Sequence, residues 1–241
     1  MQKQDLAAYP EAYSFFSPHL DREDYREMSI LRFRAGSALM EESCCDDNAA
    51  YYLLDGVGEG SCSILKDLEN GLYYVPIKLE KDSFVGVSET LEATPAKRAI
   101  SIFAKSDVVA LRIPKALFHR WAREKPDFLM IVFKKVLSLS WKQRAVVSSC
   151  NSHSTDVKLA AYLQYLYQIY SASCCPPGYT GPVRLLDTHQ EIAHAVGCSG
   201  RTVDRAINSL NKSGRITIRR GKIHIDKAQY EALLRYVEGH A

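Results

Sequence analysis

Hydrophobic residues recur every three or four positions between residues 188 and 212, and a single glycine interrupts the pattern. The spacing predicts two short amphipathic helices joined by a tight turn. Their buried sides are expected to consist of Ile192, Ala193, Val196, Val203, Ala206, Ile207 and Leu210. Thr188 and Glu191 have the spacing of a capping box at the start of the first helix. Gly197 suits the end of that helix, and Ser199 can cap the second one.

The hydrophobic pattern changes after Ser213-Gly214, where isoleucines alternate with polar residues on both sides of a basic turn. The isoleucines are Ile216, Ile218, Ile223 and Ile225, and the turn is Arg219-Arg220-Gly221-Lys222. This alternation predicts a two-stranded wing. Residues 188–225 contain seven Lys and Arg against Glu191 and Asp204, a net charge of +5, so the other residues sum to −2 within the total of +3. The basic charge is therefore local, as a phosphate-binding surface requires.

The polar side of the second helix carries Arg201, Asp204, Arg205 and Asn208. Together with the turn and the basic wing, this face has the outline of a winged helix-turn-helix that places side chains against base edges. An amphipathic helix pair can also be a packing unit whose charged face is only solvated, but the order of cap, turn, polar face and wing favours DNA binding. Arg205 is expected to pair with guanine. Asp204 either accepts a hydrogen bond from cytosine N4 or orients Arg201 or Arg205 within the helix.

The first half of the chain has a different pattern, made of short strand-like runs. Up to about Asp24 the sequence predicts short helices interrupted by Pro10 and Pro18. From Met28 to about Ile113, the runs ILRFRAG, AAYYLLDG, GLYYVPIKL and AISIFA are separated by turn residues. Many short strands at this spacing predict a β-sandwich or jelly roll.

A long helix is expected from Pro126 to about Val147. Its hydrophobic positions alternate steps of three and four, like the seam of a two-stranded coiled coil. The seam consists of Leu129, Val132, Val136, Leu139, Gln143 and Val146. A homodimer is the consequence, since helix-turn-helix modules usually read paired half-sites. The alternative is that the helix covers the β-rich domain, and Phe128, Ile131 and Phe133 broaden its apolar surface enough to pack on both sides.

The stretch THQEIAHAVGCSGRTVDRAINSL and the wing after it closely resemble the DNA-binding domain of the CRP/FNR family of bacterial regulators. The resemblance implies a sensor domain first, a long dimerisation helix next and a DNA-binding domain last. The fold is then α+β, with a double-stranded β-helix (jelly roll) sensor at residues 1–125, a dimerisation helix and hinge at 126–152, and a winged helix-turn-helix at 153–241. The glycines of the family's β-roll are matched more loosely, by Gly56 and Gly86.

The resemblance also implies roles for individual residues of the second helix. Family members use the serine at its start and the threonine three positions later mainly for phosphates, which correspond to Ser199 and Thr202. The Arg-Glu pair of the cyclic-nucleotide-sensing prototype is replaced by Gly200-Arg201, while the later arginine is kept as Arg205, so a different target sequence is expected. The full set of expected DNA-binding residues is Thr188, Gln190, Ser199, Gly200, Arg201, Thr202, Asp204, Arg205, Asn208 and Arg219.

The effector pocket implied by the resemblance lies around the sequence FVGVSETLEATPAKRAIS. Family members that bind cyclic AMP have a glutamate directly after the glycine, where this chain has Val87, and an arginine further on, which Arg98 matches. Losing this acceptor leaves a ribose hydroxyl unpaired in a buried site, which argues against cyclic AMP. Another anion could be bound by Gly86, Lys97, Arg98, Gln143 and Arg144. The competing interpretation is that Lys97 and Arg98 form a solvated surface pair.

The seven cysteines suggest a second kind of sensor, because thiolates bind metals or clusters and can be oxidised. The adjacent pairs Cys44-Cys45 and Cys174-Cys175 could hold a metal or metalloid, or undergo oxidation, although ordinary thiols are the simpler interpretation. No cysteine precedes Cys44, which argues against the N-terminal iron–sulfur cluster of oxygen-sensing family members. Haem is left open, because His19 or His119 could ligate it but no spacing singles one out. The cofactor therefore stays unknown.

The composition, 46% hydrophobic and 24% charged, is that of an ordinary globular protein. The sequence has no apolar run of membrane-spanning length and no leader, so a cytoplasmic location is expected. Without GxSxG, HExxH or a phosphate-cradling glycine loop, the chain is not expected to be an enzyme. We predict a homodimeric transcription regulator that binds a palindromic operator under the control of a small-molecule effector or redox signal, and contacts RNA polymerase if it is an activator. The alternative is an effector-binding β-roll, or a thiol or metal sensor, without sequence-specific DNA binding.

Overall fold

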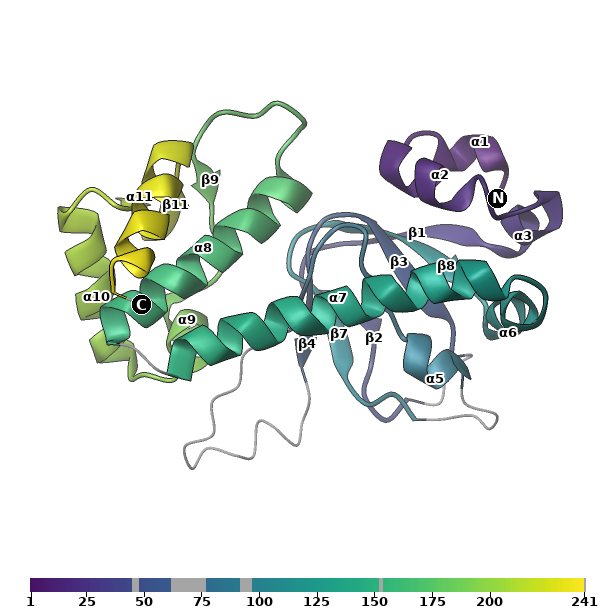
Figure 1. Cartoon of the computed structure of the whole chain (residues 1–241), viewed down its shortest axis with the longest axis horizontal. Helices are drawn as coiled ribbons and strands as arrows, with labels where there is room; N and C mark the ends of the chain where they lie inside the picture. Colours follow the sequence, from purple (N-terminus) through teal and green to yellow (C-terminus); the bar gives the residue numbers. More distant parts are fainter. Residues whose placement is uncertain (45–47, 62–76, 92–96, 152–153, 241) are drawn as a thin grey trace. The chain divides into compact units, whose positions relative to one another are not determined.

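The structure, a computed structural model, describes the chain except for residues 45–47, 62–76, 92–96, 152–153 and 241, and it leaves out the side chains of Ser61 and of residues 142–151. The described residues form two compact units, one ending at Ser140 and the other running from Trp141 onward. The division falls inside helix α7 (Pro126–Asn151), which is labelled in Figure 1.

Two antiparallel sheets form the β-roll of the first unit. Its described strands are β1 (Ser29–Phe33), β2 (Ala38–Met40), β3 (Ala50–Asp55), β4 (Gly58–Ser61), β5 (Ile77–Leu79), β6 (Phe84–Val85), β7 (Ser101–Ala104) and β8 (Val108–Ile113). One sheet has the strand order β1-β8-β3-β6, and the other has the order β2-β7-β4-β5. Tyr52 of β3 lies opposite Leu111 of β8, and both side chains are buried. This register places hydrophobic side chains in the core, and the jelly-roll prediction is confirmed.

Short helices pack against the core of the β-roll. In the first unit they are α1 (Lys3–Leu6), α2 (Pro10–Phe16), α3 (Arg22–Glu27), α5 (Val87–Leu91) and α6 (Lys115–Glu124). Pro10 opens α2, where its missing N–H leaves no hydrogen bond unmade. Phe16 packs edge-to-face on Tyr52 with ring centroids 5.0 Å apart, and Phe128 of α7 lies 6.0 Å from Phe16. The N-terminal helices are therefore part of the β-roll core, since such contacts add to the stabilisation from burial.

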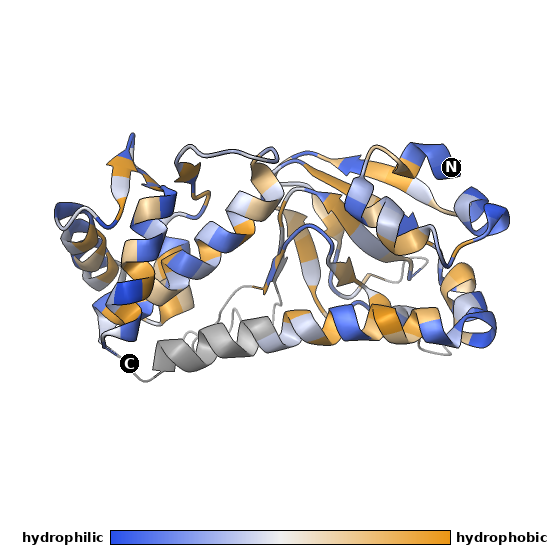
Figure 2. Cartoon of the chain, turned by 45° about the horizontal axis from the view of Figure 1, so that its top comes forward, coloured by the Kyte–Doolittle hydropathy of each residue, from blue (hydrophilic) through white to orange (hydrophobic). Residues whose placement is uncertain are grey.

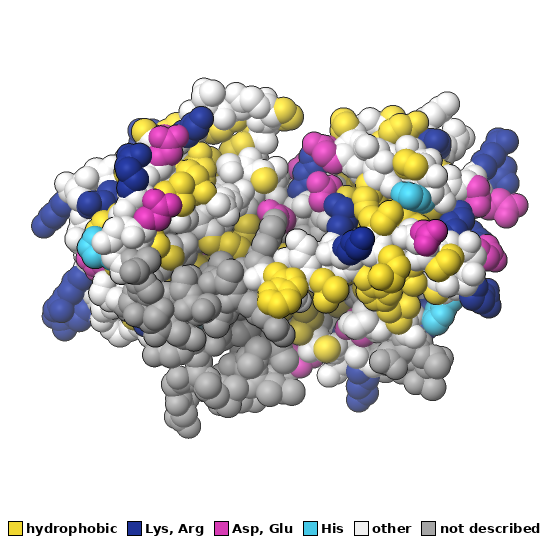
Figure 3. All heavy atoms as spheres, viewed as in Figure 1, with side chains coloured by type: hydrophobic (Ala, Val, Ile, Leu, Met, Phe, Trp, Pro, Cys, Tyr) yellow, Lys and Arg dark blue, Asp and Glu magenta, His cyan; other side chains and the backbone are white. Residues whose placement is uncertain are grey.

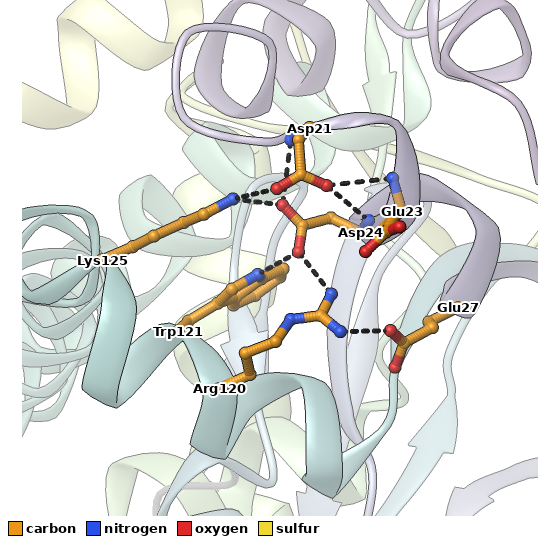
Figure 4. Close-up of polar contacts among 7 residues, drawn as sticks. All are labelled: Asp21, Glu23, Asp24, Glu27, Arg120, Trp121 and Lys125. Carbon is orange, nitrogen blue, oxygen red and sulfur yellow. Dashed lines mark hydrogen bonds and ion pairs between the residues drawn. The ribbon is translucent and has the colours of Figure 1, made fainter.

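A buried carboxylate joins α3 to α6, as Figure 4 shows. Asp24 is completely buried and accepts hydrogen bonds from Arg120 Nη2 at 2.7 Å, from Trp121 Nε1 at 3.0 Å and from Lys125 Nζ. Burial by itself raises the pKa of Asp24, but the hydrogen bonds from Lys125 and Arg120 outweigh burial, and the pKa lies below its usual value. Arg120 also pairs with Glu27 at 2.5 Å. The ionised Asp24 thus fixes α3 on α6.

Helix α7 packs one side against the core of its own chain. Val132 is completely buried, and Leu129 and Val136 pack against the same cluster. The prediction of a dimer seam is therefore wrong for Val132, while Leu129 and Val136 are only partly covered by the β-roll. On the part of α7 with described side chains, residues 126–141, the large hydrophobic side chains that stay exposed are Met130, Leu137 and Trp141, at 56%, 57% and 67%. Gln143 and Val146, the last seam positions, lie where side chains are not described.

The second unit is built from helices and a small sheet. Its described elements are α8 (Thr155–Cys174), β9 (Val183–Arg184), α9 (His189–Val196), α10 (Gly200–Lys212), β10 (Thr217–Arg219), β11 (Lys222–Ile225) and α11 (Lys227–Glu238). Hydrophobic and hydrophilic residues alternate around these helices in Figure 2. The predicted inner side chains of α9 and α10 are buried, and β10 pairs with β11. The winged helix-turn-helix prediction is confirmed. Among the described residues, no helix combines the length and the apolar character that crossing a bilayer requires.

We expect Asp24→Asn to lower the free energy of unfolding by about 3 kcal/mol at neutral pH, because an amide cannot neutralise Arg120 and Lys125. The pKa of Asp24 is lower in the folded chain than in the unfolded chain. The stabilisation by the carboxylate is therefore present above the ordinary Asp pKa of about 4, and it is lost as the pH falls through the lower, folded value. Urea unfolding of both proteins from neutral to acidic pH should show their difference shrinking.

The control for this experiment is Glu23→Gln, because Glu23 lies on the same helix with an exposed side chain. This variant should unfold like the unsubstituted protein at every pH. A stability difference between Asp24→Asn and the unsubstituted protein that does not depend on pH would contradict the ionised state of Asp24.

Candidate functional site

Local hydrogen bonds set the ends of α9 and α10 as the sequence predicts. Thr188 Oγ1 accepts a hydrogen bond from the N–H of Glu191 at 3.2 Å, and the N–H of Thr188 donates to the Glu191 carboxylate at 2.6 Å. This is a complete capping box. Gly197 ends α9 with a φ of 68°, in the left-handed region that favours glycine. Ser199 Oγ then accepts from the N–H of Thr202 at 3.2 Å and caps α10.

The residues that the sequence assigns to DNA binding are all exposed. They are Thr188, Gln190, Ser199, Gly200, Arg201, Thr202, Asp204, Arg205, Asn208 and Arg219. Four of them share the face of α10 opposite its buried stripe, namely Arg201, Asp204, Arg205 and Asn208. Within the part of the chain that the structure describes, the guanidinium groups of Arg201 and Arg205 have no hydrogen-bond or ion-pair partner. Both groups are therefore available to an anionic ligand.

Asp204 is paired with a residue of the other helix. Its Oδ1 lies 2.7 Å from Nδ1 of His189, in the first turn of α9. The sequence left open a pair within α10, between Asp204 and Arg201 or Arg205, and the structure corrects this alternative. His189 is also a residue that the sequence did not reveal. Its contact spans 15 positions along the chain, whereas helical spacing reaches only three or four.

Two residues with positive φ form the basic turn of the wing. Arg220 has a φ of 49° and Gly221 a φ of 71°, the signs of a type I′ turn, whose twist matches a hairpin. Arg219 and Arg220 are both exposed. Asn211 Oδ1 in α10 accepts a hydrogen bond from the N–H of Ile218 at 3.2 Å, so the wing is tied directly to that helix.

The expected effector residues of the β-roll include a buried cation. Arg98 is only 1% exposed, and its Nη2 donates to the carbonyl of Ala49 at 2.8 Å. Gly86 has a φ of 73°, and a Cβ there would lie 2.6 Å from Arg98 Nη1. Lys97 is exposed. The interpretation of Lys97 and Arg98 as a solvated pair is therefore wrong for Arg98.

Two buried polar side chains on α5 lie in the same region, and the sequence did not single them out. Glu89 is 6% exposed, and its carboxylate accepts from the N–H of Ala99 at 3.3 Å and from Ser88 Oγ at 2.7 Å. The hydroxyl of Thr90 lies 2.6 Å from the carbonyl of Gly86. A glycine followed three and four residues later by polar side chains on a short helix is the only local signal that could have found them.

The remaining sensor candidates do not assemble into a site among the described residues. Those that fall outside the description are Cys45 and the side chains of Gln143 and Arg144. Cys44 is exposed, and the described part contains no group of three or more His, Cys, Asp or Glu that could hold a metal. Burial raises the pKa of the Cys175 thiol, which opposes thiolate formation. His19 stacks on Phe128 with ring centroids 5.0 Å apart.

We expect Gly86→Ala to lower the Tm more than Gly36→Ala. Both glycines have positive φ, 73° and 87°. Alanine therefore costs about 1–2 kcal/mol of backbone strain at each. A methyl group at Gly86 would also meet Arg98 and the carbonyl of Ala49, whereas nothing lies within 4 Å of one at Gly36. Thermal unfolding of the two variants compares them directly, and equal losses would contradict the close packing of Arg98.

The sequence of residues 157–236 matches the family described as Crp-like helix-turn-helix domain. The global nitrogen regulator of Nostoc sp. strain PCC 7120 is 24% identical over 177 residues, which cover 73% of this chain and 76% of that protein. The nitrogen fixation regulation protein FixK of Bradyrhizobium diazoefficiens is 26% identical over 219 residues, which cover 89% of this chain and 87% of FixK.

Solved structures share the fold over most of the chain. TTHA1359, a CRP/FNR-family transcriptional regulator from Thermus thermophilus, aligns with a TM-score of 0.67 and 20% identity, covering 88% of this chain and all of that one. FixK2 from Bradyrhizobium japonicum aligns with a TM-score of 0.60 and 12% identity, covering 86% and 96%. The shared fold and the matched domain confirm the resemblance seen in the sequence. Residues 157–236 therefore match a Crp-like helix-turn-helix domain, and most of the chain has the fold of solved CRP/FNR-family regulators.

Proposed function

We propose that this protein is a DNA-binding transcription regulator that acts as a homodimer on a palindromic operator. The observation that carries the proposal is the exposed polar face of α10, which lies opposite a buried stripe and is tied to a basic wing. In helix-turn-helix proteins the second helix enters the major groove with its N-terminal residues against base edges. The relatives are named a global nitrogen regulator and a nitrogen fixation regulation protein, which supports a regulatory function.

The exposed residues divide by chemistry into two groups. Hydroxyl and amide groups at helix N-termini suit phosphate oxygens, and the basic wing adds charge. We assign the phosphate backbone to Thr188, Gln190, Ser199, Gly200, Thr202 and Arg219. We assign the base edges to Arg201, Asp204, Arg205 and Asn208. Ser199 Oγ lies 2.8 Å from Thr202 Oγ1, so these two hydroxyls form one polar cluster at the start of α10.

The exposed stripe of α7 is the proposed dimer contact. Met130, Leu137 and Trp141 are spaced by seven and four residues, which places them on one side of the helix. Figure 3 shows hydrophobic side chains along this helix at the surface of the molecule. A second copy of α7 would cover them, and a symmetric dimer suits paired half-sites.

In this proposal residues 1–125 are the sensor, residues 126–152 are the dimerisation helix and hinge, and residues 153–241 are the DNA-binding domain.

The proposed effector is a small anion held in the β-roll by Arg98. This arginine is buried, and a buried cation is favoured where counter-charge or hydrogen bonds reach it. Gly86, Lys97, Gln143 and Arg144 would complete the site. Cyclic AMP is not proposed, because a buried Val87 follows Gly86. Effector binding would change the packing of α7 on the β-roll and so shift the population of the DNA-binding arrangement.

A second candidate function keeps the β-roll as a sensor without sequence-specific DNA binding, through an effector or through thiols such as Cys44, which is exposed. Sequence-specific operator binding at moderate salt would exclude this second candidate and support the regulator. A regulator of the proposed kind acts in the cytoplasm, and it contacts RNA polymerase where it activates transcription.

Arg205→Ala should abolish sequence preference while leaving weak, salt-sensitive binding. A bidentate pair between arginine and guanine is worth about 1–3 kcal/mol of discrimination, whereas phosphate contacts do not depend on sequence. Competition between a selected duplex and random duplex, at low and moderate salt, measures both the sequence preference and the salt-sensitive affinity for any duplex. Arg123→Ala removes an exposed positive charge from α6 and serves as the control. Unchanged specificity of Arg205→Ala would refute the assignment.

Leu137→Glu should raise the dimer dissociation constant about 100-fold, because the dimer would bury two unpaired carboxylates at an apolar contact. Sedimentation equilibrium measures the change, and operator affinity should fall with it. Tyr179→Glu places the same charge at an exposed hydrophobic position outside α7, 49% exposed, and should leave the dimer intact. A Leu137→Glu protein that remains as dimeric as the control would rule out this side of α7.

A further inference from the structure

We propose that His189 is a positioning residue for DNA specificity. It holds the Asp204 carboxylate on the exposed face of α10, so that Asp204 accepts a hydrogen bond from the exocyclic amine of a cytosine. The inference rests on the proposed DNA binding by that face. It adds His189, a residue of α9 that acts on the DNA only through Asp204.

The contact joins the first turn of α9 to the second turn of α10. His189 Nδ1 lies 2.7 Å from Asp204 Oδ1, and the two side chains are 35% and 55% exposed. A carboxylate only accepts hydrogen bonds, so the proton of this bond is on Nδ1. Each carboxylate oxygen has further accepting capacity, and Oδ2 of Asp204 is not used in the pair. The more exposed member, Asp204, can therefore accept from His189 and from a base together.

The second ring nitrogen of His189 cannot take over this task. Its Nε2 is buried and has no hydrogen-bond partner among the described residues. A nitrogen without solvent-exposed surface does not reach a base or a phosphate. The effect of His189 on a bound duplex must therefore pass through the orientation of Asp204.

Asp204 needs such a partner because the phosphates of DNA repel a carboxylate. A hydrogen bond from His189 draws part of the charge away and fixes the side chain before the duplex arrives, which reduces the ordering cost of binding. The neighbouring cations Arg201 and Arg205 are not used for this purpose, since their guanidinium groups have no partner within the described chain. The pair thus leaves both arginines for the DNA.

The test compares Asp204→Ala with a matched pair of variants at His189. His189→Asn places an amide nitrogen at the same distance along the side chain as Nδ1, whereas His189→Leu has a similar branched shape and no donor. Each full-length protein selects duplexes from a random-sequence library, and the selected sites are sequenced. Titrations then use the duplex selected by the unsubstituted protein, the same duplex with one base pair changed, and random duplex.

We expect the unsubstituted protein to prefer cytosine at one position of each half-site, and Asp204→Ala to lose about tenfold of that preference. His189→Leu should lose it to a similar extent, His189→Asn should retain it, and affinity for random duplex should not fall in any of the three. Combining His189→Leu with Asp204→Ala should add no further loss, because both act through one contact.

His189→Leu that keeps the full preference while Asp204→Ala loses it would overturn the inference and leave the proposed function standing. His189→Asn that fails as badly as His189→Leu would also overturn it, since the donor would then not be what matters. An unsubstituted protein that selects no sequence would overturn the proposed function itself. Thermal unfolding of each variant separates a loss of fold from a loss of preference.

Discussion

Helix α7 has hydrophobic side chains on two sides, and the β-roll of its own chain can cover only one of them. Val132 is completely buried against the β-roll core, while Leu137 is more than half exposed about one turn and a half further on. The rest of the molecule depends on this division, because the same helix that completes the β-roll core also carries the surface proposed for a second copy. A change in the packing of α7 on the β-roll would therefore also shift the hydrophobic side chains on its exposed side.

Two deeply buried charged side chains of the first unit, Asp24 and Arg98, have different surroundings. Asp24 accepts from Arg120, Trp121 and Lys125, which is a closed network with a structural purpose. Arg98 is held against a backbone carbonyl and a glycine that leaves no space for a side chain. Arg98 belongs to the effector site proposed for the β-roll. Because its guanidinium is buried, a small anion would reach it through a conformational change and not directly from solvent.

The sequence was most informative where structure depends on neighbours along the chain. The capping box at Thr188, the left-handed Gly197 and the wing hairpin each involve residues a few positions apart, so their chemistry can be predicted without knowing the fold. Prediction failed where distant elements meet. Hydrophobic periodicity showed that α7 is apolar, but it could not tell which side faces the β-roll, and neither His189 nor the two-residue strand β9 had a local signal.

The small sheet of the second unit has the order β10-β11-β9, so β10 is an edge strand whose outer backbone groups face away from any neighbouring strand. Exposed edges invite pairing with other chains. Here the outward amide of Ile218 is occupied by Asn211, and the strand ends at the exposed Arg219, which the exposed Arg220 of the turn follows. Two copies that approach edge to edge would bring like charges together. The positive charge proposed to attract a nucleic acid therefore also protects the protein against β-sheet aggregation when no nucleic acid is bound.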